Sequence, residues 1–176
     1  MDFLELAKQR FSTRSFSDKK VETDKILKIL ESAKVAPTAR NKQPIKIYYC
    51  KDDEKLKILN SASPCEYNAQ LMFAVTYNLD ECWYNSYSNI PSGMIDATIV
   101  ATHMVLEAES LGIGSVYIGA FDPNLVTEKF EIPTSNKIAL LLFMGYKSKD
   151  CVASEMHTIY KSDDELFEEL KLKNEK

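Results

Sequence analysis

The chain has 176 residues, of which 45% are hydrophobic and 27% are charged. These values are typical of globular domains, so they argue against a disordered or fibrous protein. The 22 Lys and Arg residues and 26 Asp and Glu residues give a formal net charge of −4. A mildly acidic chain is a poor candidate for broad nucleic-acid binding, because that requires a basic face.

The first ten residues, MDFLELAKQR, lack the basic segment and apolar core of a secretory signal. No apolar stretch has the length of a membrane span, so we expect a cytoplasmic protein without a membrane partner. The cysteines show no C-x-x-C pairing and are interpreted as free thiols; they are Cys50, Cys65, Cys82 and Cys151. Neither histidine lies at ligand spacing from a cysteine, so no metal site is expected.

Two helices are predicted at the start of the chain. Asp2 and Glu5 have the layout of a capping box for the first helix. Thr23 and Asp24 open the second helix as its cap and first-turn acid, and its apolar residues follow the 3.6-residue period at Ile26, Leu27, Leu30 and Ala33. Residues 36–44 begin and end near prolines, so this segment continues neither a helix nor a sheet.

Four strand-length apolar runs follow, at residues 45–50, 71–77, 115–118 and 138–144. Between them we predict helices at residues 53–62, 94–111 and 123–130, the last capped by Asp122 with Pro123 in its first turn. The longest of these is apolar around much of its circumference, and Gly112 fits its C-cap. The aromatic segment 82–91 has no clear period; it is interpreted either as a lid or as a packing element.

A final helix is predicted from the capping box of Ser162 and Glu165, with apolar residues Leu166, Phe167 and Leu170. No repeat or linker divides the chain, so residues 1–176 are predicted to form one α/β or α+β domain around a small central sheet. Its many apolar helix faces and strands leave open whether a monomer of 176 residues can cover them all.

Three segments could carry chemistry. The first is Arg10-Phe11-Ser12-Thr13-Arg14-Ser15-Phe16, which places two guanidinium groups four residues apart among three hydroxyls. Such donors suit a phosphate monoester, which is held by charge-assisted hydrogen bonds. A solvated turn with surface ion pairs is the alternative.

The second segment, residues 38–44, carries the amides of Asn41 and Gln43, which can match the edge of a heterocycle or simply form a turn. The third, residues 112–120, is glycine-containing but follows a helix instead of opening one. The spacings G-x-G-x-x-G and G-x-x-x-x-G-K-[ST] are both absent, so classical dinucleotide binding has weak support.

The order of these segments resembles the nitroreductase family of flavin enzymes. The resemblance runs from about residue 2 to residue 146 and rests on R-F-S-T-R-S-F, A-P-T-A-R-N-K-Q-P, S-L-G-I-G-S-V-Y-I-G-A-F-D-P and L-L-F-M-G-Y in that order. It implies an α+β fold in which helices flank a small mixed or antiparallel sheet. It also implies an intertwined homodimer with one FMN at each subunit interface.

The resemblance further implies which residues bind FMN. Arg10, Phe11, Ser12 and Arg14 correspond to the stretch that holds the phosphate and reaches the pyrimidine side of the ring. Thr38, Asn41 and Gln43 correspond to the loop that contacts the ribityl chain and the ring, and Tyr117, Ile118, Gly119 and Ala120 to the backbone that lies over the ring.

The implied activity is FMN-dependent hydride transfer from NAD(P)H to flavin N5, followed by two-electron reduction of a nitroaromatic, a quinone or a related small oxidant. The flavin would carry the chemistry, so no catalytic side chain is assigned, although Arg14 is placed to stabilise the reduced ring. Two alternatives remain open: a flavin-binding redox sensor or store with little turnover, and a flavin-free dimeric interaction module.

The chain departs from the family pattern after residue 146. Relatives commonly supply a further basic pair to the phosphate there, whereas residues 147–161 contain no arginine. Lys147, Lys149, His157 and Lys161 are the candidates to replace that pair, and the sequence does not choose among them.

Overall fold

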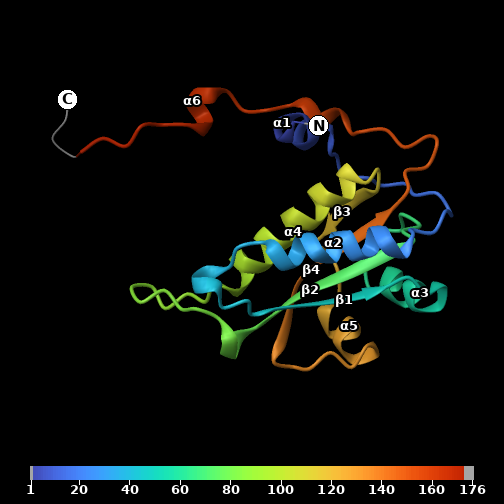
Figure 1. Cartoon of the computed structure of the whole chain (residues 1–176), viewed down its shortest axis with the longest axis horizontal. Helices are drawn as coiled ribbons and strands as arrows, with labels where there is room; N and C mark the ends of the chain where they lie inside the picture. The colour runs from blue at the N-terminus through green and yellow to red at the C-terminus, as the bar shows by residue number, and fades with distance from the viewer. Residues whose placement is uncertain (1, 173–176) are drawn as a thin grey trace.

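A four-stranded antiparallel sheet forms the centre of the computed structural model, which describes residues 2–172 (Figure 1). The strands lie in the order β1-β2-β4-β3. Their bounds are β1, Ile45–Cys50; β2, Leu71–Asn78; β3, Gly114–Ile118; and β4, Asn136–Gly145. All four predicted strands are therefore confirmed, together with the α+β class.

The two central strands are buried on both faces. In β2, Leu71, Phe73 and Val75 point into one hydrophobic cluster, while Met72 and Ala74 point into the other. Because successive residues of a strand face opposite sides, a strand covered on both faces must be apolar at nearly every position. This explains the continuous apolar run seen in the sequence.

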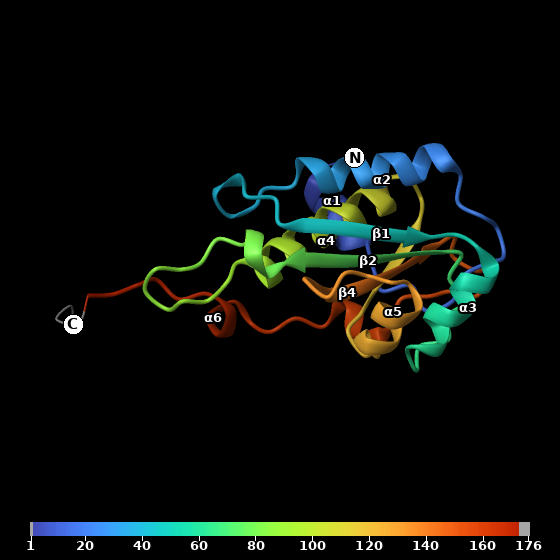
Figure 2. The ribbon, with the colours of Figure 1, turned by 90° about the horizontal axis from the view of Figure 1, so that it is seen from below.

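Helices α2 (Thr23–Val35) and α4 (Gly93–Ser110) cover one face of the sheet, as the layers in Figure 2 show. The predicted inward face of α2 is partly wrong, because Ile29 is fully buried and Leu27 is 59% exposed. In α4 the side carrying Ala101 and Met104 packs on the sheet, while Ile95 is 61% exposed. A helix that is apolar nearly all round gives no clear inward direction from its sequence.

Helices α3 (Asp53–Ser61) and α5 (Pro123–Lys129) lie on the opposite face (Figure 2). The predicted cap of α5 is confirmed, since the Asp122 carboxylate accepts hydrogen bonds from the backbone N–H groups of Asn124 and Leu125. Proline in the first turn loses no hydrogen bond there, because the first N–H groups of a helix have no partner within it.

The N-terminal helix α1 (Phe3–Gln9) packs against α4. Its predicted capping box is wrong in detail, because the Asp2 side chain accepts no capping hydrogen bond. After α1, Ser12 forms a parallel bridge with Ser115 of β3, and Phe16 forms an antiparallel bridge with Lys147. The segment between α1 and α2 therefore follows the outer edge of the sheet.

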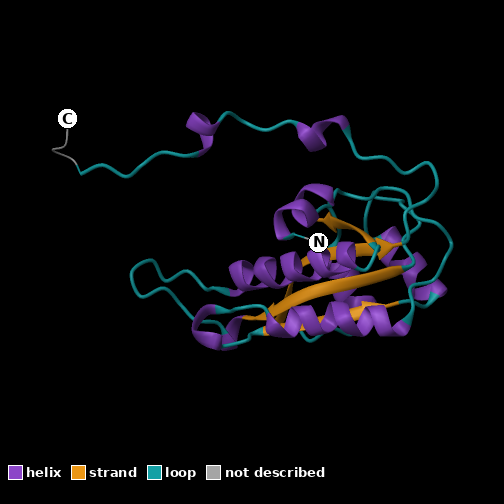
Figure 3. Ribbon diagram, turned by 45° about the horizontal axis from the view of Figure 1, so that its top comes forward, coloured by secondary structure: helices purple, strands orange, loops and turns teal. Residues whose placement is uncertain are grey.

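The C-terminal segment extends away from the rest of the chain (Figures 1 and 3). The capping box of Ser162 and Glu165 is confirmed, but α6 covers only Asp163–Leu166. Phe167 and Leu170, predicted to continue this helix, lie outside it and are 70% and 99% exposed. A single helical turn with no buried residue gains too little from packing to propagate.

The aromatic segment 82–91 projects beside the loop that follows α2 (Figures 1 and 2). Tyr84 and Pro91 form a bridge at its base, and Tyr87 near its tip is fully exposed. The Tyr87 side chain therefore packs against none of the described residues of its own chain. None of the helices in residues 2–172 has the length and apolar content needed to cross a membrane.

Candidate functional site

A cavity of about 270 Å³ lies where the segment after α1 meets the segment after β4. We call it the arginine cavity. It is lined by Arg10, Phe11, Ser12, Arg14, Ser154, Met156 and His157. All four phosphate-site residues predicted from the N-terminal segment are therefore brought together in one place.

Backbone hydrogen bonds fix the position of this segment. Thr13 N–H donates to the Ser115 carbonyl of β3 at 3.0 Å, and Ser17 N–H donates to the Tyr146 carbonyl at 2.9 Å. The second wall is attached in the same way, since Ser148 N–H donates to the Ser15 carbonyl at 3.1 Å. Both walls of the cavity are thus tied to the edge of the sheet.

Arg10 connects the cavity to the end of β3. Burial raises the pKa of Tyr117, and the nearby Arg10 guanidinium opposes that shift, as does a hydrogen bond with Thr102. Ser12 also forms a parallel bridge with Ser115 of β3, two residues before Tyr117. Residues 10–14 therefore lie beside the strand that leads into the predicted ring-binding segment 117–120.

Arg14 lies on the exposed side of the cavity, near the hydroxyl of Tyr67. A hydrogen bond with Cys65 and burial raise the pKa of Tyr67, whereas the Arg14 guanidinium acts to lower it. The Arg14 guanidinium therefore lies close to the phenol of Tyr67, and within residues 2–172 it forms no salt bridge.

The donor set of the arginine cavity fits a phosphate group. Two guanidinium groups and the hydroxyls of Ser12 and Ser154 line it, and such donors form short, charge-assisted hydrogen bonds with a dianion. Directly behind Ser12, the buried hydroxyls of Thr13 and Ser115 have no hydrogen-bond partner among the described residues. Buried hydroxyls without a hydrogen-bond partner are uncommon in proteins. This part of the chain therefore has hydrogen-bonding groups that are available to a ligand or to water.

Of the four basic candidates after residue 146, only His157 lines the arginine cavity. Its Nε2 lies 2.9 Å from the Lys8 carbonyl oxygen, which ties the C-terminal segment to α1. The ammonium of Lys147 is instead bound to the buried carboxylate of Glu109 at 2.9 Å and lies behind the ring of Phe11. Ser154, Met156 and His157 were not among the predicted site residues, because only the folded chain places them beside residues 10–14.

The second predicted segment forms a separate, rigid loop. Asn41 and Gln43 adopt positive φ angles of 53° and 49°, and the Gln43 side-chain amide donates to Asn41 Oδ1 at 2.9 Å. Gln43 N–H donates to the Thr38 hydroxyl at 3.0 Å. Ala39 N–H donates to the buried carboxylate of Asp96 in the first turn of α4 at 2.8 Å.

This loop and the arginine cavity lie at opposite ends of α4. Asp96 anchors the loop, while Glu109, thirteen positions later (109 − 96 = 13), holds Lys147 behind the cavity. At 1.5 Å per residue, the two anchors are about 20 Å apart along the helix axis. A single chain therefore does not bring Thr38, Asn41 and Gln43 to the arginine cavity.

The third predicted segment runs from the end of β3 into open surface. Tyr117 donates to the Thr102 hydroxyl at 3.2 Å, Ile118 is 2% exposed, and the Ala120 carbonyl accepts from Ser63 at 2.8 Å. At Gly119 an added Cβ would meet nothing within 4 Å. The backbone at this position is thus accessible to a ligand.

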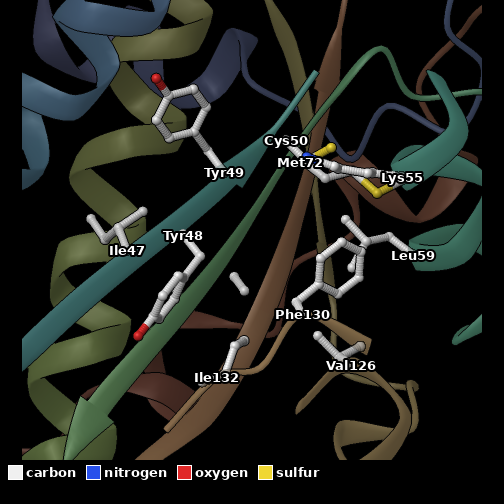
Figure 4. A pocket seen from close by; sticks show the side chains of 11 residues that line it. Ile47, Tyr48, Tyr49, Cys50, Lys55, Leu59, Met72, Val126, Phe130 and Ile132 are labelled. Atoms are coloured by element: carbon white, nitrogen blue, oxygen red, sulfur yellow. The ribbon is translucent and has the colours of Figure 1, made fainter. Parts of the chain in front are cut away.

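A second cavity, of about 330 Å³, lies on the other face of the sheet between β1, α3 and α5 (Figure 4). Its walls are mostly apolar, and Lys55 is its one charged lining residue. None of the residues predicted for the site lines it. It therefore lacks the paired cations that make the arginine cavity suitable for a phosphate.

Comparison with known proteins agrees with this geometry. The model of the nitroreductase family matches residues 7–81 and 64–146. A relative from Archaeoglobus fulgidus, provisionally named NADH dehydrogenase/NAD(P)H nitroreductase, is 28% identical over 81% of this chain and 84% of its own length. The matches to two further relatives, from Methanothermobacter thermautotrophicus and Staphylococcus aureus, span 62% and 58% of the length of those proteins.

Among solved structures, a nitroreductase family protein from Clostridium difficile 630 is 34% identical, with a TM-score of 0.90 over 98% of this chain and all of the other. An FMN-dependent nitroreductase from Clostridium difficile R20291 shares the fold, with a TM-score of 0.73 over 90% of this chain and 98% of its own, at 22% identity. The family match covers well over half of the sequence. The chain therefore belongs to the nitroreductase family of oxidoreductase enzymes.

Proposed function

We propose that the protein is an FMN-dependent NAD(P)H oxidoreductase that acts on nitroaromatic, quinone or related small acceptors. The observation that carries this proposal is the arginine cavity at the edge of β3, where Arg10, Ser12 and Arg14 line one space. The names of the relatives, which include NAD(P)H and FMN, agree with it.

Each part of the cavity has a separate role in this proposal. Arg10 and Ser12 bind the phosphate, with Phe11 forming the wall behind them. Arg14, which is exposed, would lie toward the pyrimidine edge of the ring, where its charge would stabilise negative charge in the reduced state. The open backbone at Gly119 lets the ring lie against the end of β3.

FMN supplies the electron chemistry when bound: hydride transfer from NAD(P)H to N5, then two-electron reduction of the acceptor. We expect the nicotinamide and the acceptor to use the same site in turn, which predicts ping-pong kinetics. No side chain of this chain is needed as an acid or a nucleophile, and its residues bind and orient.

A homodimer would complete this site. The amides of Asn41 and Gln43 are exposed and pre-organised, yet about 20 Å along α4 from the arginine cavity of their own chain. The loop of a second copy can reach that cavity, as the family resemblance implies. The exposed apolar residues Phe167, Leu170 and Ile95 give such a dimer surface to bury.

The absorption spectrum of the purified protein, followed by anaerobic mixing with NADH and NADPH, tests the proposal. Oxidised flavins absorb at about 450 nm, and an enzyme should lose this band rapidly on mixing. A bound flavin that reduces slowly and turns over no acceptor would indicate a redox store. A folded, colourless protein that takes up no FMN would contradict the proposal.

A further inference from the structure

The imidazole of His157 lines the arginine cavity. One of its two ring nitrogens can act as a hydrogen-bond acceptor or as a donor, depending on the charge of the ring. Within residues 2–172 the partner of its Nε2 is the Lys8 carbonyl oxygen, at 2.9 Å. A carbonyl oxygen only accepts hydrogen bonds, so Nε2 carries a hydrogen in both charge states of the ring. Nδ1 is then an acceptor in the neutral imidazole and a donor in the imidazolium.

A phosphate bound in this cavity is held by hydrogen-bond donors, so what His157 contributes depends on the charge of its ring. Neutral His157 would turn a lone pair toward an anion, whereas the imidazolium would donate a charge-assisted hydrogen bond. The ring is also held in place, by Lys8 at Nε2 and by an edge-to-face contact with Phe11 at 6.1 Å between ring centroids. A fixed ring loses little freedom when it binds, so its charge state decides its contribution.

The surroundings of His157 couple its protonation to an anionic ligand. Its charged neighbours come from four parts of the chain: Arg10 and Arg14 in the cavity wall, Lys147 with Glu109 behind Phe11, Lys8 with Glu5 in α1, and Glu155 two residues earlier in the chain. Glu109 and Glu5 are each paired with a lysine. Among the described residues, the charges at the cavity that have no ion-pair partner are therefore mainly positive, which favours entry of an anionic ligand.

We propose that His157 binds the FMN phosphate through Nδ1 as the imidazolium, which makes retention of FMN depend on pH. This inference rests on the proposed FMN function and adds the residue that completes its phosphate site. It takes the place of the basic pair that the family resemblance implies after residue 146. Loss of the His157 proton on raising the pH removes one donor and one positive charge from the site.

The test compares FMN with riboflavin, which has the same ring and ribityl chain but no phosphate. Apoprotein is titrated with each by flavin fluorescence, at about pH 6 and about pH 9, on either side of the ordinary range of histidine. The variants are His157→Gln and His157→Arg. His103→Gln is the matched control, because His103 lies on α4 with Nδ1 at 3.0 Å from the Ile99 carbonyl.

The Gln variant should weaken FMN binding on the order of tenfold at about pH 6 and little at about pH 9, with riboflavin unchanged. Comparing variants at one pH cancels the titration of the phosphate itself, whose second pKa is near 6. The Arg variant should bind FMN tightly at both pH values, and His103→Gln should behave as the wild type. In NMR spectra, His157 should stay protonated to higher pH with FMN than with riboflavin.

Equal FMN affinity of the Gln variant and the wild type at about pH 6 would overturn the inference and leave the proposed function intact. An equal loss of riboflavin affinity would assign His157 a purely structural role and would overturn it too. Failure of the wild type to bind FMN at either pH would overturn both proposals.

Discussion

The ammonium of Lys147 lies 2.9 Å from the carboxylate of Glu109, whose side chain is 2% exposed. The same ammonium is 4.4 Å from the centre of the Phe11 ring. This ion pair joins the last turns of α4 to the segment after β4 and supports one wall of the arginine cavity. Burying a carboxylate is costly without a partner, so the pair fixes where Phe11 can lie.

Replacing Lys147 with Met should lower the free energy of unfolding by about 2–3 kcal/mol, because it leaves the Glu109 carboxylate buried without a counter-ion. Adding Glu109→Gln to this variant should restore part of that loss. Urea unfolding of the two single variants and the double variant measures the coupling. Losses that simply add would show that the two side chains do not interact.

Gly114 links the stability of β3 to the geometry of the cavity. A Cβ at this position would lie 2.5 Å from Thr13 Oγ1 and 3.0 Å from Lys147 Cγ. Gly114→Ala should therefore displace Thr13 and Ser12 and cost about 1–3 kcal/mol of stability, with weaker FMN binding. Thermal unfolding checks the first effect, and fluorescence titration checks the second.

Gly119→Ala is the matched control for stability, because an added Cβ there meets nothing within 4 Å. Its melting temperature should stay close to that of the wild type. Equal melting temperatures for both variants would contradict the close approach of Thr13 to Gly114.

The sequence predicted two kinds of feature well: strands that are buried on both faces, and helix ends whose capping residues are adjacent in the sequence. β2 and β4 were predictable from their apolar runs, and the start of α5 from Asp122 and Pro123, because these signals lie within a few residues. The inward faces of α2 and α4 were not, because Leu27 and Ile29 are both apolar and only tertiary packing chooses between them. Periodicity cannot decide when more than one face is hydrophobic.

Of the residues that line the arginine cavity, only those after α1 could be proposed from the sequence. Arg10, Ser12 and Arg14 are close in sequence, so their spacing alone suggested an anion site. His157 joins them through contacts between residues far apart, such as its hydrogen bond to Lys8. Nothing in the local sequence distinguished His157 from Lys147, because the partner of Lys147 is the distant Glu109.

Replacing Arg10 and Arg14 together with Met should weaken FMN binding by about a hundredfold or more, because each charge-assisted hydrogen bond contributes about 1.5–3 kcal/mol. The purified variant should be colourless and folded. The flavin content after gel filtration and the circular dichroism spectrum measure the two outcomes.

The control is a second double variant, which removes two positive charges outside the arginine cavity. Lys57→Met with Lys137→Met changes two exposed lysines that do not line the arginine cavity. This variant should keep its flavin. Retention of colour by the Arg10 and Arg14 variant would contradict the assignment of the phosphate site.

The Tyr146 hydroxyl donates to Glu22 at 2.6 Å, and this hydrogen bond is the main cause that lowers the pKa of Glu22 from 4.5 to about 2. Because the folded-state pKa is depressed, the stabilisation is present above about pH 4.5 and is lost as the pH falls toward 2. Tyr146→Phe should return the pKa toward 4.5, as measured by NMR titration of the carboxyl carbon. Tyr160→Phe, at an exposed position after β4, should leave it unchanged.

The exposed apolar residues of the C-terminal segment provide a test of the dimer. Phe167 and Leu170 are 70% and 99% exposed, and burying such side chains contributes about 1.5–3 kcal/mol each. If they pack on a second copy, Phe167→Asp with Leu170→Asp should weaken the dimer about a hundredfold or more, as measured by light scattering over a dilution series. Phe167→Leu with Leu170→Met keeps the side chains apolar and should keep the dimer. An Asp variant that remains dimeric at all concentrations would show that these side chains do not hold the copies together, because no association could bury two carboxylates there without a cost.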